Sequence, residues 1–176
     1  MKCKNCKNEF NGILTQKVCS YGCAIILVMQ GREKKRLKEE RKTKKETRDR
    51  LKTKSDWLRD AQACFNKYIR LRDAKYPCIS CGRHHKGQFH AGHYRTVGAS
   101  PELRFNELNV HKQCAPCNDH LSGNIVNYRI GLIKKIGIEK VAWIEGPHEP
   151  KKYTIPEIIG IKEKYKQKLK DIRWNA

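Results

Sequence analysis

Four closely spaced cysteine pairs constrain the fold of this chain more than any other feature of its sequence. Two or three residues separate the members of each pair, which is the spacing of zinc ligands in small metal-stabilised folds. The N-terminus carries no apolar segment of the signal-peptide type, so we expect the thiols to stay reduced and to bind metal instead of forming disulfides. Two zinc ions would use all eight thiols. The expected ligands are Cys3, Cys6, Cys19 and Cys23 in a first site, and Cys78, Cys81, Cys114 and Cys117 in a second site.

The charge of the chain narrows the classes of function. Lysine and arginine number 39 against 18 acidic residues, which gives a formal net charge of +21, and apolar residues make up only 38% of the chain. Metal ligation would supply folding free energy that such a small apolar core cannot. No stretch approaches the ~18 apolar residues of a membrane helix, so we expect no membrane partner. The charge favours an intracellular protein that binds nucleic acid.

The first half of the chain is expected to hold a zinc finger and a basic segment. Residues 1–29 carry the first cysteine group, which resembles a treble-clef finger ending in a short helix over residues 24–29. Residues 30–54 contain neither glycine nor proline after Gly31, so a long exposed helix and a disordered tether both fit. This segment is either a passive spacer or an arm that contacts DNA phosphates. Its candidate DNA-binding residues are Lys34, Lys35, Arg36, Arg41 and Lys42.

The other two regions, residues 55–145 and 146–176, are expected to be mainly helical around the second cysteine group. Apolar residues recur at helical spacing in several segments of both regions. A capping box formed by Thr154 and Glu157 predicts the start of a basic terminal helix. The expected helices span residues 55–76 with an N-cap at Ser55, 125–136, 138–145 and 155–172.

The region of the second cysteine group also contains an ordered set of histidine and asparagine residues. His93, Asn109 and Asn118 follow one another in an order that resembles the HNH, or ββα-metal, nuclease family. The resemblance implies a small zinc-stabilised α+β core in which His93 ends a first strand, Asn109 precedes a second strand and Asn118 opens a helix. The flanking cysteines make the segment most similar to junction-resolving endonucleases of the endonuclease VII type.

A wider resemblance covers nearly the whole chain. The segments His90–Arg95, Leu103–Asn106, His111–Cys114 and Ser122–Asn124, with the cysteine groups and the charged spacer, are similar to the NinG family of lambdoid phages. That resemblance implies a structure-specific DNA endonuclease acting on branched recombination intermediates, namely Holliday junctions, D-loops and flaps. It also implies phage recombination proteins as partners and the cytoplasm of the bacterial host as the setting. A homodimer would suit symmetric cutting of a junction.

The chemistry of these residues fits phosphodiester hydrolysis. A neutral imidazole titrates near pH ~6.5 and can take a proton from water, which gives His93 the role of general base. Asn109 would tether its loop and so orient His93, and a Mg²⁺ or Mn²⁺ ion would assist the reaction at the phosphate. The expected catalytic residues are His93, Asn109 and Asn118, the expected ligands of the catalytic ion are His90, Asn118 and His120, and the expected phosphate contacts are Arg95 and Arg104.

Gly92 departs from the family pattern. HNH proteins usually carry Asp or His immediately before the first catalytic histidine as a metal ligand, and glycine offers no ligand atom there. His90 is the expected replacement, because it is close in sequence and imidazole suits a borderline metal, and Asp119 and His120 are further candidates. The alternative function is a non-catalytic zinc-finger protein that binds DNA as a recombination accessory, with Gly92 marking a lost metal site. A zinc protein that binds RNA is a further alternative.

Overall fold

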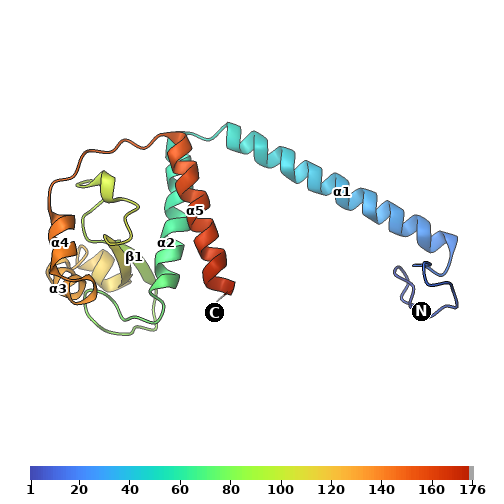
Figure 1. Ribbon diagram of the computed structural model, residues 1–176, viewed down its shortest axis with the longest axis horizontal. Helices are drawn as coiled ribbons and strands as arrows, with labels where there is room; N and C mark the ends of the chain where they lie inside the picture. Colours follow the sequence, from blue (N-terminus) through green and yellow to red (C-terminus); the bar gives the residue numbers. More distant parts are fainter. Residues whose placement is uncertain (175–176) are drawn as a thin grey trace. The chain divides into compact units, whose positions relative to one another are not determined.

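The computed structural model describes residues 1–174 and has the mixed α+β architecture expected from the sequence (Figure 1). The chain divides into two compact units, Met1–Lys52 and Thr53–Ala176, and each unit contains one of the two cysteine groups. No helix among the described residues combines the length and the apolar character needed to cross a lipid bilayer.

The first unit consists of a cysteine-bearing loop region and one helix. An isolated β-bridge between Lys2 and Glu9 closes the loop that carries the first cysteine pair. Helix α1, Tyr21–Arg50, begins at the N-cap Ser20, whose hydroxyl accepts a hydrogen bond of 3.2 Å from the amide of Cys23. The first turn of α1 therefore supplies one of the four thiols of this unit.

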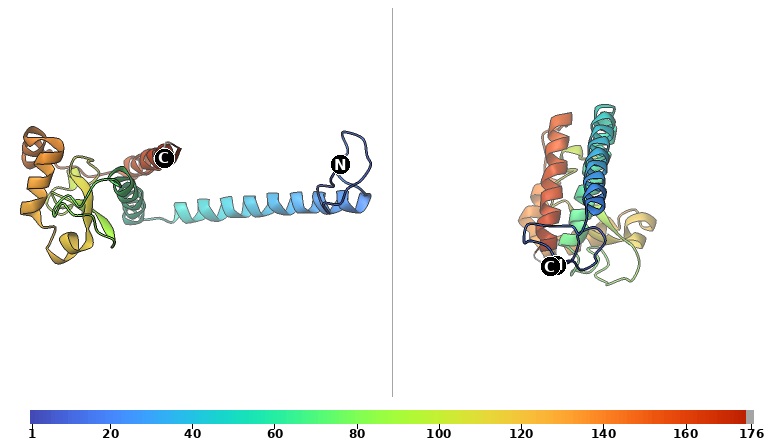
Figure 2. Two further views of the ribbon diagram at one scale, coloured as in Figure 1. Left: turned by 90° about the horizontal axis from the view of Figure 1, so that it is seen from below. Right: turned by 90° about the vertical axis from the view of Figure 1, so that its right-hand side faces the viewer.

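Helix α1 runs without a break through most of the basic segment (Figure 2). The sequence-based end of the helix at residue 29 is therefore wrong, and of the two interpretations of residues 30–54 the exposed helix is confirmed as far as Arg50. Glutamate, lysine and arginine favour helix, and ion pairs such as Arg36–Glu33 (2.7 Å) add to this preference. No residue of α1 is buried.

The second unit begins with helix α2, Lys54–Arg72. The expected N-cap at Ser55 is wrong, because Thr53 occupies that position. The hydroxyl of Thr53 accepts a hydrogen bond from the amide of Asp56 (3.2 Å), and the carboxylate of Asp56 accepts one from the amide of Thr53 (3.0 Å). This reciprocal pair satisfies two backbone donors at once, which Ser55 alone could not do.

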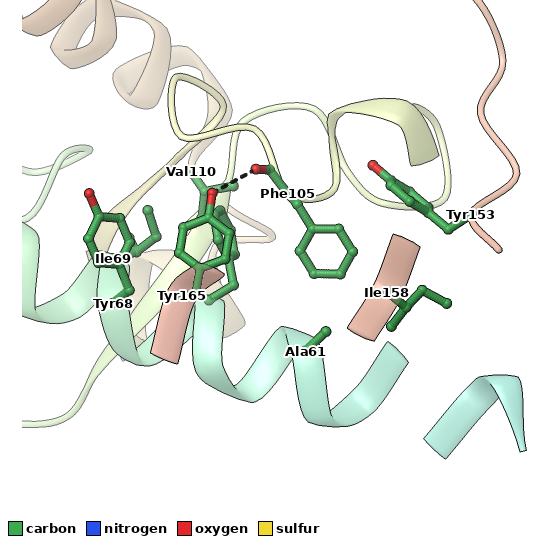
Figure 3. Packing of buried hydrophobic residues seen from close by; sticks show 9 residues of the cluster. Ala61, Tyr68, Ile69, Phe105, Val110, Tyr153, Ile158 and Tyr165 are labelled. Atoms are coloured by element: carbon green, nitrogen blue, oxygen red, sulfur yellow. Dashed lines mark hydrogen bonds between the residues drawn. The ribbon is translucent and has the colours of Figure 1, made fainter. Parts of the chain in front are cut away.

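Helix α5, Ile155–Trp174, packs along α2 (Figure 1). Its expected capping box is confirmed, because the amide of Thr154 donates to Glu157 (2.7 Å) and the amide of Glu157 donates back to the Thr154 hydroxyl (3.5 Å). The core between the two helices is aromatic, and the Tyr165 hydroxyl donates to the carbonyl of Phe105 at 3.3 Å (Figure 3). This core consists of Ala61, Phe65, Tyr68, Ile69, Phe105, Val110, Tyr153, Ile158 and Tyr165.

A two-stranded antiparallel sheet lies against α2. Strand β1, Phe89–His93, pairs with β2, Val110–Cys114, over their full lengths. The short helix η2, Pro116–His120, follows β2 almost directly. The expected helices over residues 125–136 and 138–145 are confirmed, and they pack around a second apolar core that includes Tyr128. The remaining helices of the unit are η1, Pro101–Leu103, α3, Ile125–Ile136, and α4, Ile138–Glu145.

Candidate functional site

The first cysteine group has the geometry of a metal site. All four ligand sulfurs lie within 4.8 Å of one another, and the Cys6–Cys19 and Cys19–Cys23 sulfur distances are 3.5 and 3.6 Å. A tetrahedral zinc site with Zn–S bonds of about 2.3 Å requires sulfurs roughly 3.8 Å apart. The side-chain amide of Asn5 donates to the sulfur of Cys23 (3.4 Å), and this bond lowers the pKa of the Cys23 thiol.

The second cysteine group is more buried and has the same geometry. Its four sulfurs also lie within 4.8 Å of one another, with 3.9 Å between Cys81 and Cys114. The Nε2 of His85 lies 3.2 Å from the sulfur of Cys81. Burial would raise the pKa of Cys81, but hydrogen bonds from His85 and Arg83 lower it to about 6. Each of the two groups can therefore hold a metal ion such as zinc, as the cysteine spacing predicted.

His93 lies at the end of β1 with one ring nitrogen already engaged. Its Nε2 is 3.0 Å from the carbonyl oxygen of Arg104. A carbonyl oxygen only accepts, so Nε2 carries the hydrogen and Nδ1 keeps its lone pair. Burial lowers the pKa of His93, and backbone hydrogen bonds with Arg104 and Ala91 offset this only in part. The ring is therefore neutral at pH 7, with Nδ1 as a proton acceptor.

Asn109 closes the loop that connects the two strands. It is fully buried, and its side-chain oxygen accepts a hydrogen bond from the amide of Arg95 (2.8 Å). Its side-chain nitrogen donates to the carbonyls of Arg95 (3.0 Å) and Leu103 (3.3 Å). The residue after Leu103 is Arg104, whose carbonyl holds His93. Asn109 therefore holds the loop segment whose Arg104 carbonyl binds His93, although the two side chains do not bond each other directly.

His90 and the η2 helix form a second polar cluster. The Nε2 of His90 lies 3.5 Å from a carboxylate oxygen of Asp119, and the amide of Asn118 donates to the other oxygen of that carboxylate (2.5 Å). Asp119 and His120 are both exposed, and of the two it is Asp119 that lies next to His90. The cluster brings an imidazole, a carboxylate and an amide together from β1 and η2, which are donor types that bind divalent cations.

The space at Gly92 is filled by a neighbouring side chain. A Cβ atom at Gly92 would lie 2.1 Å from Oε1 of Gln113. Gln113 is fully buried, and its amide nitrogen donates to the Ser80 hydroxyl (2.7 Å) and the Gly123 carbonyl (2.5 Å). Among the described residues, no partner satisfies the buried Oε1 of Gln113. A ligand-bearing side chain at position 92 would therefore require Gln113 to move.

The arginines expected to contact phosphate are held by local hydrogen bonds. The guanidinium of Arg104 donates to the side-chain oxygen of Gln62 (2.9 Å), and that of Arg95 donates to the hydroxyl of Ser100 (3.3 Å). Arg104 and Gln62 line a surface cavity of about 480 Å³, which α2 also borders through Asn66. Gln62 carried no sequence signal, because a glutamine on a helix is ordinarily an exposed surface residue.

The basic residues named on α1 differ in whether they form ion pairs. Arg36 pairs with Glu33, and Lys42 lies 3.9 Å from both Glu39 and Glu46. These pairs are exposed, so they contribute little to stability and leave the side chains able to exchange partners. Lys34, Lys35 and Arg41 are also exposed.

Comparisons with known proteins identify the family. The chain matches the family described as Bacteriophage Lambda NinG protein over residues 1–175. It is 45% identical to protein ninG of Escherichia phage lambda over 189 aligned residues, which cover 98% of this chain and 93% of that protein. It is 44% identical to protein ninG of Salmonella phage P22 and to that of Escherichia phage 933W, with the same coverage. No solved structure matches. The resemblance to NinG drawn from the whole chain is thus confirmed, and the chain belongs to the phage lambda NinG family.

Proposed function

We propose that this chain is a divalent-metal-dependent endonuclease that cuts branched DNA recombination intermediates such as Holliday junctions, D-loops and flaps. The observation that carries the proposal is the buried, neutral His93, whose Nε2 is fixed by the Arg104 carbonyl, on the same strand as the His90 cluster. The net charge of +21 supports a polyanionic substrate. The setting is the cytoplasm of the bacterial host, where a homodimer would suit symmetric cutting.

The order of elements supports an HNH-like core. Strand β1 ends at His93, Asn109 immediately precedes β2, and Asn118 lies in the helix that follows β2. The second cysteine group brackets this hairpin and would hold it through a structural zinc ion. In the first unit, one cysteine pair lies in a loop, and α1 begins between the two cysteines of the other pair. This arrangement supports a treble-clef finger.

Each residue of the proposed site has a separate task. Nδ1 of His93 accepts the proton of the attacking water, while the Arg104 carbonyl keeps the ring oriented. A bound Mg²⁺ or Mn²⁺ ion would supply positive charge to the phosphate and the leaving oxygen. His90 and Asn118 would hold that ion, and Asp119 would contribute the carboxylate that Gly92 cannot. His120 stands next in sequence as a further ligand.

The decisive experiment is single-turnover cleavage of a labelled four-way junction across a titration of Mg²⁺ and Mn²⁺. We expect His93→Ala to lower the rate by roughly 10²–10⁴-fold, the usual effect of removing a general base, while zinc content and junction binding stay unchanged. His84→Ala is the matched control, because His84 is exposed in a loop outside the site. His90→Ala and Asp119→Asn should instead raise the metal concentration needed for half-maximal rate.

The dependence of the cleavage rate on pH gives an independent test. Burial lowers the pKa of His93, so the rate should hold its plateau down to about pH 6.5, the ordinary histidine value, and fall only below it. If His93→Ala cleaves at the wild-type rate, or if the wild-type rate begins to decrease with falling pH well above pH ~6.5, His93 is not the general base.

A non-catalytic DNA-binding accessory is the second candidate function. The observation that favours it is the contact between Gly92 and Gln113, which leaves no room for the usual metal ligand. In that case the protein would bind junctions tightly and leave them uncut at every metal concentration tested.

A further inference from the structure

A cavity of about 680 Å³ lies on the side of β2 that faces away from β1. It is bordered by the end of α2, the turn at Cys78–Gly82 and the end of α3, and its walls include the apolar side chains of Pro77, Ile79, Leu108 and Ile136. Its volume is in the range of about 300–1,000 Å³ typical of ligand pockets. The zinc ligand Cys78 is part of its lining, but none of the residues proposed for catalysis or for the catalytic Mg²⁺ or Mn²⁺ ion lines it, so it is separate from the cleavage site.

The floor of this cavity is fixed by hydrogen bonds to the free edge of β2. The guanidinium of Arg72 donates to the carbonyl of Val110 (2.9 Å), and the amide of Lys112 donates to the carboxylate of Asp73 (3.1 Å). The amide of Ile79 donates to the carbonyl of Lys112 (3.1 Å). These bonds use the backbone groups of β2 that a further β-strand would need, so a β-strand cannot pair there. The ligand of the cavity must therefore be of another kind.

The cavity carries a surplus of positive charge. Four cationic side chains line it, against the single carboxylate of Glu107, which lies 3.9 Å from Arg72 and pairs with Lys168 at 2.5 Å. Asp73 lies beneath the floor, almost fully buried, and accepts hydrogen bonds from Arg72 and Lys135 (2.8 Å each). The two carboxylates of Asp73 and Glu107 cannot neutralise these four cations together with Lys168, so the cavity favours an anion. The four cations are Arg72, Lys112, Lys134 and Lys135.

The lining also includes an aromatic ring and an exposed lysine. The side chain of Tyr76 is 55% exposed, and the Nζ of Lys135 lies 4.7 Å from the centre of its ring. Lys134 is exposed on α3. Aromatic and apolar surface next to cations matches the two halves of a nucleotide, because the base stacks on rings and the phosphate pairs with ammonium or guanidinium groups.

We propose that this cavity binds one unpaired nucleotide of the DNA substrate, with its base against Tyr76 and the apolar walls and its phosphate at Lys134. A paired base is stacked within the duplex and cannot enter, whereas flaps and branch points offer unpaired nucleotides. The inference rests on the proposed action on branched DNA and gives it a structural source of selectivity.

The test measures binding of the zinc-loaded full chain by fluorescence anisotropy, without added Mg²⁺ or Mn²⁺ so that no cleavage occurs. The ligands are a duplex with a single-stranded tail, the same duplex with an abasic tail, and a fully paired duplex with the same number of phosphates. We expect Tyr76→Ala to weaken binding of the normal tail by about 5- to 150-fold, the range for one stacked base, and binding of the other two ligands by less than about twofold.

Lys134→Gln should weaken binding of both tailed duplexes and spare the paired one, because it removes a phosphate contact. Trp143→Ala and Lys140→Gln are the matched controls, since both residues are exposed on α4 outside the cavity. Equal losses on all ligands, no loss on the tailed duplex, or no wild-type preference for the tail would each overturn the proposal. A tail preference that depends on Tyr76 in a protein that never cuts would reject the nuclease and leave this inference standing.

Discussion

Replacing Asn109 by alanine should destabilise the second unit and slow cleavage together, because its amide closes the loop that holds His93. The substitution removes three hydrogen bonds, two to Arg95 and one to Leu103, from a fully buried position. At about 0.5–1.5 kcal/mol each, their loss should lower the free energy of unfolding by about 2–4 kcal/mol. For a unit of this size the midpoint of thermal unfolding should fall by roughly 8–15 °C.

The assay combines thermal unfolding of the zinc-loaded protein, followed by circular dichroism, with single-turnover cleavage at a temperature where the variant is folded. Asn127→Ala is the control, because Asn127 is exposed on α3 and its side chain donates to that of Asn124, and its effect on the free energy of unfolding should stay within about 0.5 kcal/mol. Asn109→Asp should cost more than alanine, since it buries a charge and turns acceptors toward the carbonyls that the amide bonded. A variant with wild-type thermal stability would refute the role of Asn109 in holding the loop. A destabilised variant that cuts at the wild-type rate would refute the link from the loop to His93.

Three further predictions concern metal, salt and pH. Elemental analysis should find two zinc ions per chain, and one ion or none on folded protein would contradict that expectation. Cys117→Ser should unfold the second unit, whereas Cys3→Ser should affect only the first unit. If about 6–10 phosphates are neutralised, DNA affinity should drop by roughly 10³–10⁵ between about 50 and 200 mM salt, and neutralising Lys34 and Lys35 should flatten that dependence unless α1 is a passive spacer. Burial would raise the pKa of Asp73, but hydrogen bonds from His111, Arg72 and Lys135 hold it far below the usual range. The stability that Asp73 contributes is therefore present above its unfolded pKa of about 3.9 and lost as the pH falls toward the lowered value. Asp73→Asn should lower the free energy of unfolding, measured by urea unfolding, by about 3–5 kcal/mol at neutral pH and by progressively less below about pH 4. A loss of stability that does not change with pH would exclude the ion pairs as its cause.

Local patterns in the sequence were enough to predict much of the secondary structure and the metal groups. The cysteine spacing predicted both four-sulfur groups, and the bounds of α3 and α4 follow from apolar periodicity alone. The capping box before α5 was visible because its two residues are three apart. The start of α2 was missed although Thr53 and Asp56 have the same spacing, since Ser55 is an equally good N-cap when judged singly.

The arrangement of the candidate site depends on contacts that no local pattern contains. Whether Asp119 or His120 lies next to His90 depends on the backbone path of η2, because neighbouring residues of a helix point in different directions. The filling of the space at Gly92 depends on Gln113 from the other strand.

The carboxylate of Asp73 shows most clearly the difference between what local sequence patterns predict and what tertiary contacts decide. No local pattern marks this residue as buried, yet it is 1% exposed and accepts hydrogen bonds from residues 39 and 62 positions further along the chain. Its partners, the amide of Lys112 and the side chain of Lys135, come from β2 and α3. The sequence by itself determined which residues could bind metal and where helices form, because those properties depend on residues a few positions apart. Only the tertiary structure decided which charges are buried together and which cavity they line, because burial is a property of segments that meet after folding.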